Sequence, residues 1–200
     1  MSNIGNHIIQ IFKDDKPTVK EYLKIAINMI IFHRWLNNNN YIDMQSSINN
    51  ISYIKIDNDS IDNDINSILS QIDNYSSNQS NFQITLNFYS KIEKKFYIFS
   101  KPEGLWEKWN LLVTICDSNK TLDKENKIRK YIAYILKEIN SEKDFMPDLK
   151  LNDFENVNDK ANNNTFNFPY EIKFTPEFEQ QSIISIFKNM NIKDSFDKII

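Results

Sequence analysis

The chain has 200 residues, a formal net charge of -3 at pH 7, 40% hydrophobic residues and 26% charged residues. This length and composition are typical of one globular domain that buries a core without disulfides or metals. Arginine and glycine each occur only twice. The chain therefore has neither a cluster of arginines to bind phosphates nor a glycine-rich phosphate-binding loop. We expect neither a nucleic-acid partner nor a nucleotide site.

Cysteine and histidine are equally scarce. The single Cys116 cannot form an internal disulfide. Together with the two histidines, His7 and His33, it supplies too few soft ligands for a metal centre. We therefore expect no metal and no cofactor. The N-terminus lacks a signal-peptide pattern, and no apolar run approaches the ~20 residues of a membrane span. These features predict a cytosolic or nuclear protein.

The first elements that the sequence predicts are a strand and a buried helix. Residues 7–12 are β-prone, and the turn-forming residues 14–17 lead into a helix expected over 17–36, with Thr18 and Glu21 as a capping box. Apolar residues surround nearly the whole circumference of this helix. Such a pattern predicts a helix at the centre of the fold.

Two further helices are predicted to pack with one face each. A β-prone segment at 51–56 precedes a helix with apolar residues at helical spacing, capped by Asp59 or Ser60. Another amphipathic helix begins near Thr121 and ends near Ser141. Their single apolar stripes place both helices at the surface, against the core.

Strict alternation of apolar and polar residues predicts two strands, at 82–88 and 109–115. They should pair in an antiparallel manner through a long connection at about 90–104, which includes a turn at 102–104. A further strand at 166–174 is expected at an edge of the sheet because it contains a proline. The fold class predicted from these elements is α+β, with a sheet that is at least partly antiparallel.

Two segments in the last quarter of the chain lack a clear helix or strand pattern. The asparagine-rich residues 148–165 are expected to form a mobile loop. The apolar stretch at 183–187 fits a strand or a helix, and its periodicity does not decide between them.

The two histidines raise the question of acid-base chemistry. Neither His7 nor His33 has a nucleophile or a carboxylate at suitable local spacing. At the end of the predicted central helix, His33 and Arg34 meet the negative end of the helix dipole favourably. We therefore interpret these residues as structural or as part of a partner interface, and we expect no catalytic residues.

The connection at 90–104 holds an unusual apolar cluster. Its four consecutive members are Phe96, Tyr97, Ile98 and Phe99, and lysines flank them on both sides. One interpretation is that they extend a strand or fold back onto the core. The other is a protruding hydrophobic finger that docks on another protein or on a membrane, because exposed apolar patches usually mark interaction sites.

Three stretches resemble the autophagy-related protein 101 family. They are FHR at 32–34, ISYIKI at 51–56 and ITLNFYSKIEKKFYIFSKPEGLWEKWNLLVTI at 84–115. The resemblance covers nearly the whole chain and is weakest in the asparagine-rich segments. It implies a single HORMA domain over residues 1–200, in which a mixed, largely antiparallel sheet packs on a central buried helix with two further helices.

The resemblance also implies a non-enzymatic adaptor subunit of the kinase complex that initiates autophagy. Its implied partners are the HORMA domain of autophagy-related protein 13, the autophagy-initiating Ser/Thr kinase complex and downstream autophagy effectors. The implied location is the cytoplasm, with recruitment to the pre-autophagosomal structure, and any membrane contact is indirect or weak.

The finger has a counterpart in that family, whose tip reads Trp-Pro-Phe-Ser and recruits downstream autophagy factors. The matching residues here are Tyr97-Ile98-Phe99-Ser100, with an extra residue in the connection. The resemblance therefore implies that Phe96, Tyr97, Ile98 and Phe99 form an effector-binding finger.

Two other functions compete with this interpretation. One is a checkpoint-type HORMA protein, which clasps a partner peptide under a C-terminal belt and has no need of an apolar finger. The other is an unrelated hydrolase, for which the sequence offers no nucleophile, base and orienting group at a recognisable spacing.

Overall fold

The computed structural model describes residues 4–35, 40–48, 50–75, 80–95, 99–115, 124–141 and 169–176, and the expectations for 148–165 and 183–187 lie outside them. Nine helices and strands follow one another in this part of the chain. In order they are β1 (Gly5–Asp14), α1 (Lys16–Arg34), β2 (Tyr41–Gln45), β3 (Ser52–Ile56), α2 (Asp59–Tyr75), β4 (Ser80–Lys95), β5 (Phe99–Ile115), α3 (Lys124–Ser141) and β6 (Tyr170–Pro176).

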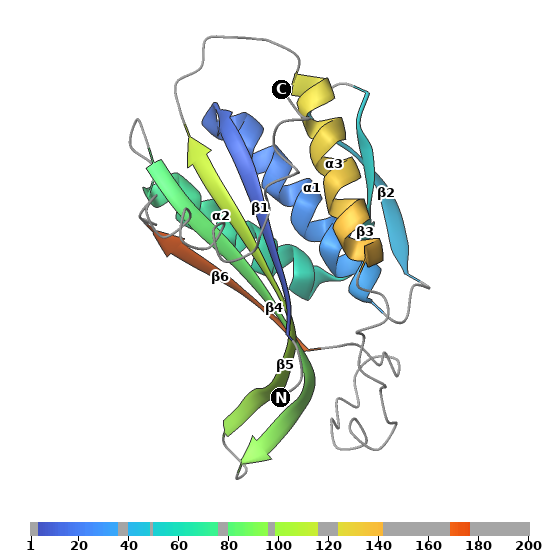
Figure 1. Ribbon diagram of the computed structural model, residues 1–200, viewed down its shortest axis with the longest axis vertical. Coiled ribbons are helices and arrows are strands. Elements are labelled where there is room, and N and C mark those ends of the chain that lie inside the picture. Colours follow the sequence, from blue (N-terminus) through green and yellow to red (C-terminus); the bar gives the residue numbers. More distant parts are fainter. Residues whose placement is uncertain are drawn as a thin grey trace.

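The described strands form two sheets (Figure 1). The larger sheet has the order β1-β5-β4-β6, in which β1 runs parallel to β5 while β4 is antiparallel to both β5 and β6. The smaller sheet is the antiparallel pair of β2 and β3. The predicted α+β class, the antiparallel pairing of β4 with β5 and the edge position of β6 are all confirmed.

Helix α1 lies at the centre of the molecule. It contacts β1 and β5 of the large sheet, β3 of the small sheet, and both α2 and α3. Consecutive residues from Ile25 to Ile31 are buried on every side of the helix. The prediction of a central helix that is apolar nearly all round is confirmed.

The first turn of α1 differs from the expected capping box. Asp15 is the N-cap, and its carboxylate accepts a hydrogen bond from the Thr18 backbone N–H at 2.9 Å. The carboxylate of Glu21 accepts instead from the backbone N–H of Ser47, at 3.0 Å. The Thr18–Glu21 box is therefore wrong, because an aspartate one turn earlier satisfies the same backbone donor.

Two expectations around the small sheet also change. Strand β2 was not predicted, because its side chains are almost all exposed and the strand carries no apolar alternation. Helix α2 is capped by Asn58 and not by Asp59 or Ser60, since the Asn58 side-chain oxygen accepts from the Ser60 N–H at 2.9 Å.

Candidate functional site

Strands β4 and β5 continue past the rest of the sheet as a two-stranded hairpin. The pairing of β1 with β5 begins at Gly5 and Glu107, and the pairing of β6 with β4 ends at Phe88. One further hydrogen bond, from the Tyr89 backbone N–H to the Pro169 carbonyl at 2.8 Å, lies just beyond Phe88. From there to the last pair, Lys95 with Phe99, β4 pairs with β5 and with no other described strand. We call residues 91–95 and 99–103 the arm; Figure 1 shows it projecting from the body of the molecule.

The arm occupies the segment that was expected to be a long connection. Residues 91–95 and 99–103 are strand, so the expected turn at 102–104 is wrong and Pro102 instead pairs with Ile92. Phe99 is the first residue of β5 and pairs with Lys95 at the end of the arm. Phe96, Tyr97 and Ile98 lie outside the described residues. The effector-binding role of these four residues stays a prediction.

A β-bulge marks the point at which the arm leaves the sheet. On one side of it Phe88 pairs with Glu107, and on the other Tyr89 pairs with Leu105, so that Trp106 is one extra residue on β5. A bulge bends a strand and increases its local twist. We call residues 88–90 and 104–107 the elbow.

Gly104 supplies the backbone geometry of the elbow. Its φ is +71°, in the left-handed region that favours glycine. A Cβ atom at this position would stand 2.1 Å from the Ser90 Oγ on the facing strand. The conformation therefore favours glycine, and a side chain here would also displace the Ser90 hydroxyl.

A buried ion pair holds the β5 side of the elbow. Arg34, the last residue of α1, donates from Nε and Nη2 to the two carboxylate oxygens of Glu107, each at 2.6 Å. The side chains are only 2% and 1% exposed. The Arg34 guanidinium also lies 5.9 Å from the centroid of the Trp106 ring. Of the two expectations for Arg34, this burial favours the structural one.

His7 extends this ion pair toward α3. Its ring stacks on Trp109 with a centroid distance of 3.9 Å. Its Nε2 lies 3.3 Å from a Glu107 oxygen, and its Nδ1 lies 3.4 Å from a Glu138 oxygen. His7 thus has two carboxylate neighbours, one from β5 and one from α3, although none lies near it in the sequence. The imidazole is buried between elements, so we assign it to the packing of β1, β5 and α3.

His33 has a different environment. It is exposed at the end of α1, and its Nδ1 donates to the backbone carbonyl of Met29 at 2.8 Å. Met29 lies one turn earlier on the same helix, so this bond is local to α1. His33 and Arg34, which are adjacent in the sequence, therefore do not form a common site.

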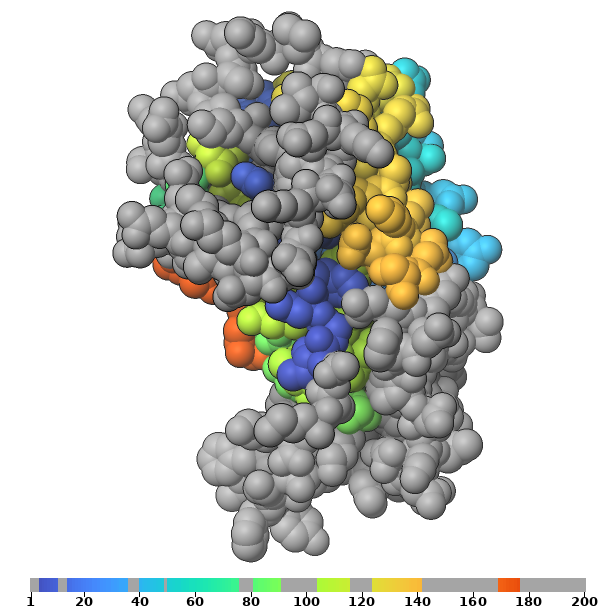
Figure 2. All heavy atoms as spheres, in the orientation of Figure 1, coloured from blue at the N-terminus to red at the C-terminus, as the bar shows by residue number. Residues whose placement is uncertain are grey.

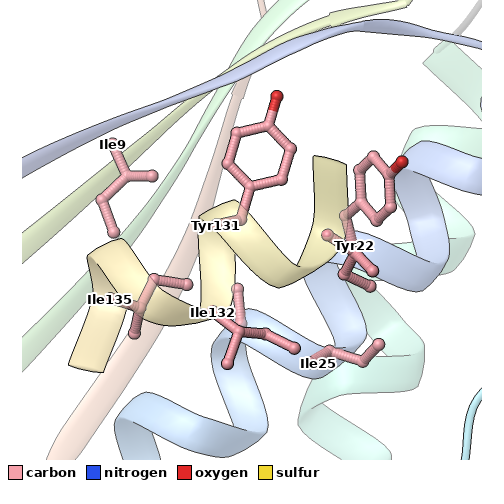
Figure 3. A pocket seen from close by; sticks show the side chains of 8 residues that line it. Ile9, Tyr22, Ile25, Tyr131, Ile132 and Ile135 are labelled. Atoms are coloured by element: carbon pink, nitrogen blue, oxygen red, sulfur yellow. The ribbon is translucent and has the colours of Figure 1, made fainter. Parts of the chain in front are cut away.

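A small crevice lies between α1, α3 and β1 (Figure 3). It has room for about one water-sized molecule. The Tyr22 hydroxyl donates to the Lys124 carbonyl at 3.3 Å, and burial raises the pKa of this tyrosine. The residues that line the crevice are Ile9, Tyr22, Ile25, Ala26, Ile128, Tyr131, Ile132 and Ile135. Its apolar lining and small size indicate a packing gap between helices.

Neither a metal cluster nor a membrane span stands out in the described part of the chain. No three His, Cys, Asp or Glu residues come together there in a way that could hold a metal ion. None of its helices is long and apolar enough to cross a membrane. The grouping with the most distinctive geometry is therefore the arm with its elbow.

The comparison with known families gives one match. The family model described as autophagy-related protein 101 matches residues 12–153. This range includes the three helices, β2 to β5, the elbow and the arm, and it leaves out β6 and most of β1. No curated protein matches the chain.

Proposed function

Since the chain belongs to the autophagy-related protein 101 family, and is therefore an autophagy-related protein, we propose that it is a non-enzymatic adaptor subunit of the autophagy-initiating Ser/Thr kinase complex. It pairs with the HORMA domain of autophagy-related protein 13 and recruits downstream autophagy factors through the arm. It acts in the cytoplasm and at the pre-autophagosomal structure, with membrane contact that is indirect or weak.

The observation that carries this proposal is the arm itself. A two-stranded ribbon without a third strand contributes little to the stability of the sheet, because isolated hairpins are only marginally stable. In the sequence the arm nevertheless leads to four consecutive apolar residues, 96–99, and its last described pair is Lys95 with Phe99. Apolar residues at the end of such a ribbon support a docking function.

The arm is tested by replacing two of its apolar residues. If these side chains protrude, as we propose, the double variant Tyr97→Ala/Phe99→Ala should change the free energy of unfolding by about 0.5 kcal/mol or less. Core positions would instead lose ~3–5 kcal/mol each. Chemical denaturation measures this difference, and a double variant that unfolds at neutral pH contradicts the proposal.

Pairing is tested with the purified HORMA domain of autophagy-related protein 13. We expect a one-to-one heterodimer on size-exclusion chromatography with light scattering. The heterodimer should also melt at a higher temperature than the isolated chain, because a partner that binds only the folded state stabilises it. Two separate monomers at micromolar concentration would contradict the pairing.

A further inference from the structure

We propose that the elbow is a positioning device: it sets the pairing register of the arm, with Gly104, Glu107 and Arg34 as its positioning residues. The inference rests on the proposed function, because it takes the arm to be the binding element. It concerns how the arm is held and not which factor the arm binds.

The bulge decides which residues face each other across the arm. With the extra residue Trp106 in place, Lys91 stands opposite Glu103 and Glu93 stands opposite Lys101. If the register of the sheet continued without the bulge, each residue of β4 would face the next residue along β5. Lys94 would then stand opposite Lys101, and Glu93 would stand opposite Pro102.

The two registers differ in their electrostatics. Opposite charges at directly opposed positions of an antiparallel pair are stabilising, and like charges there are destabilising. In the observed register two residues of β4 stand opposite residues of unlike charge on β5, whereas the alternative register places Lys94 opposite Lys101. Because no third strand or helix covers the arm in the described structure, these cross-strand positions and the elbow are what specifies its register.

The contacts of the elbow fix the bulge at Trp106. On its C-terminal side both carboxylate oxygens of Glu107 are held by Arg34, which belongs to the central helix. The Trp106 ring contacts both the Arg34 guanidinium, at 5.9 Å from its centroid, and the ring of Phe88, at a centroid distance of 6.0 Å. On the N-terminal side Gly104 provides the positive φ that permits the change of register. The extra residue therefore has a defined place and cannot move along β5 without loss of these contacts.

A direct test measures the register by nuclear magnetic resonance. In the wild-type chain we expect cross-strand contacts between backbone protons of Glu93 and Lys101. The variant Gly104→Ala should lose them, either to a Lys94–Lys101 contact or to loss of the arm signals. The other glycine of the chain gives the matched control: Gly5→Ala, at the edge-strand position opposite Glu107, should keep the wild-type contacts. Unchanged Glu93–Lys101 contacts in Gly104→Ala would overturn the inference.

A charge exchange tests the same register with the elbow intact. Lys101→Glu places like charges opposite each other and should lower recruitment of downstream factors several-fold. Adding Glu93→Lys restores the unlike pair and should bring recruitment back to within about twofold of the wild type. Adding Glu103→Lys instead changes the net charge by the same amount but should not rescue, because Glu103 faces Lys91. Equal recruitment by the two double variants would overturn the proposed register.

The two tests separate this inference from the proposed function. The backbone contacts report the register without any binding partner. Normal recruitment by Tyr97→Ala/Phe99→Ala would therefore refute the docking role of the arm, while the contacts between Glu93 and Lys101 would still decide the role of the elbow.

Discussion

At the scale of single residues, Glu107 is the side chain on which most of the elbow depends. It accepts two hydrogen bonds from Arg34 and faces His7. We expect Glu107→Gln to lower the free energy of unfolding by about 3–5 kcal/mol, because it leaves the Arg34 charge buried without its counter-ion. The exposed ion pair of Glu171 with Lys173 gives a control, since Glu171→Gln should cost no more than about 1 kcal/mol. Equal losses in urea denaturation would contradict the assignment.

The same pair predicts a dependence of stability on pH. Burial alone would raise the pKa of Glu107, but the hydrogen bonds and charges of Arg34 and His7 outweigh it and hold the pKa below the ordinary value of 4.5. The stabilisation is therefore complete above pH 4.5 and is lost as the pH falls through the lower folded-state pKa. We expect the stability gap between wild type and Glu107→Gln to shrink below pH 4.5. A gap that stays constant down to pH 3 would contradict this.

The carboxylates that surround His7 could not be predicted from the sequence, because they lie far from His7 along the chain. Glu138 lies 131 residues away in the sequence, and Glu107 is on the strand that pairs with β1. Only the fold brings them together, so no local spacing could indicate them. The caps of α1 and α2 were placed one turn or one residue too late for another reason, since several Asp, Asn, Ser and Thr residues there compete for the same backbone donors.

At the scale of elements, α1 was predictable and the arm was not. A helix of a globular protein that is apolar on all sides is buried in the core, so the apolar pattern of its sequence was enough to predict the position of α1. The side chains of strand β2 are almost all exposed, and its sequence lacks the alternation by which strands are identified. The sequence of the arm lacks this alternation as well. The arm was consequently interpreted as a connection, although its apolar residues 96–99 marked it as unusual.

The central position of α1 predicts a large contrast between two isoleucines. Ile27 of α1 is completely buried, and Ile42 of β2 is 37% exposed. We expect Ile27→Ala to lower the free energy of unfolding by about 2–5 kcal/mol, through lost burial and the cavity left behind. Ile42→Ala, which removes the same atoms at the surface, should cost about 0.5 kcal/mol or less. Similar values for both variants would show that α1 is not the core of the domain.

At the scale of the whole molecule, composition and pattern predicted the α+β class, a sheet that is at least partly antiparallel and the central helix, while the family resemblance implied that the sheet is mixed. The parallel pairing of β1 with β5 and the bulge at Trp106 depend on long-range register, which a single sequence does not encode in any local pattern. The resemblance to the autophagy-related protein 101 family is confirmed by the family match. The described residues thus form a packed body around α1 from which the arm projects, an arrangement that supports the proposed adaptor function.

The most direct test of the adaptor function is a bridging measurement. The HORMA domain of autophagy-related protein 13 is immobilised, the full chain is added, and the downstream autophagy factors retained from a cell extract are quantified. We predict that the wild-type chain retains these factors and that Tyr97→Ala/Phe99→Ala binds the immobilised domain equally well but retains none above background. Equal retention of downstream factors by the wild type and the double variant would contradict the adaptor function of the arm.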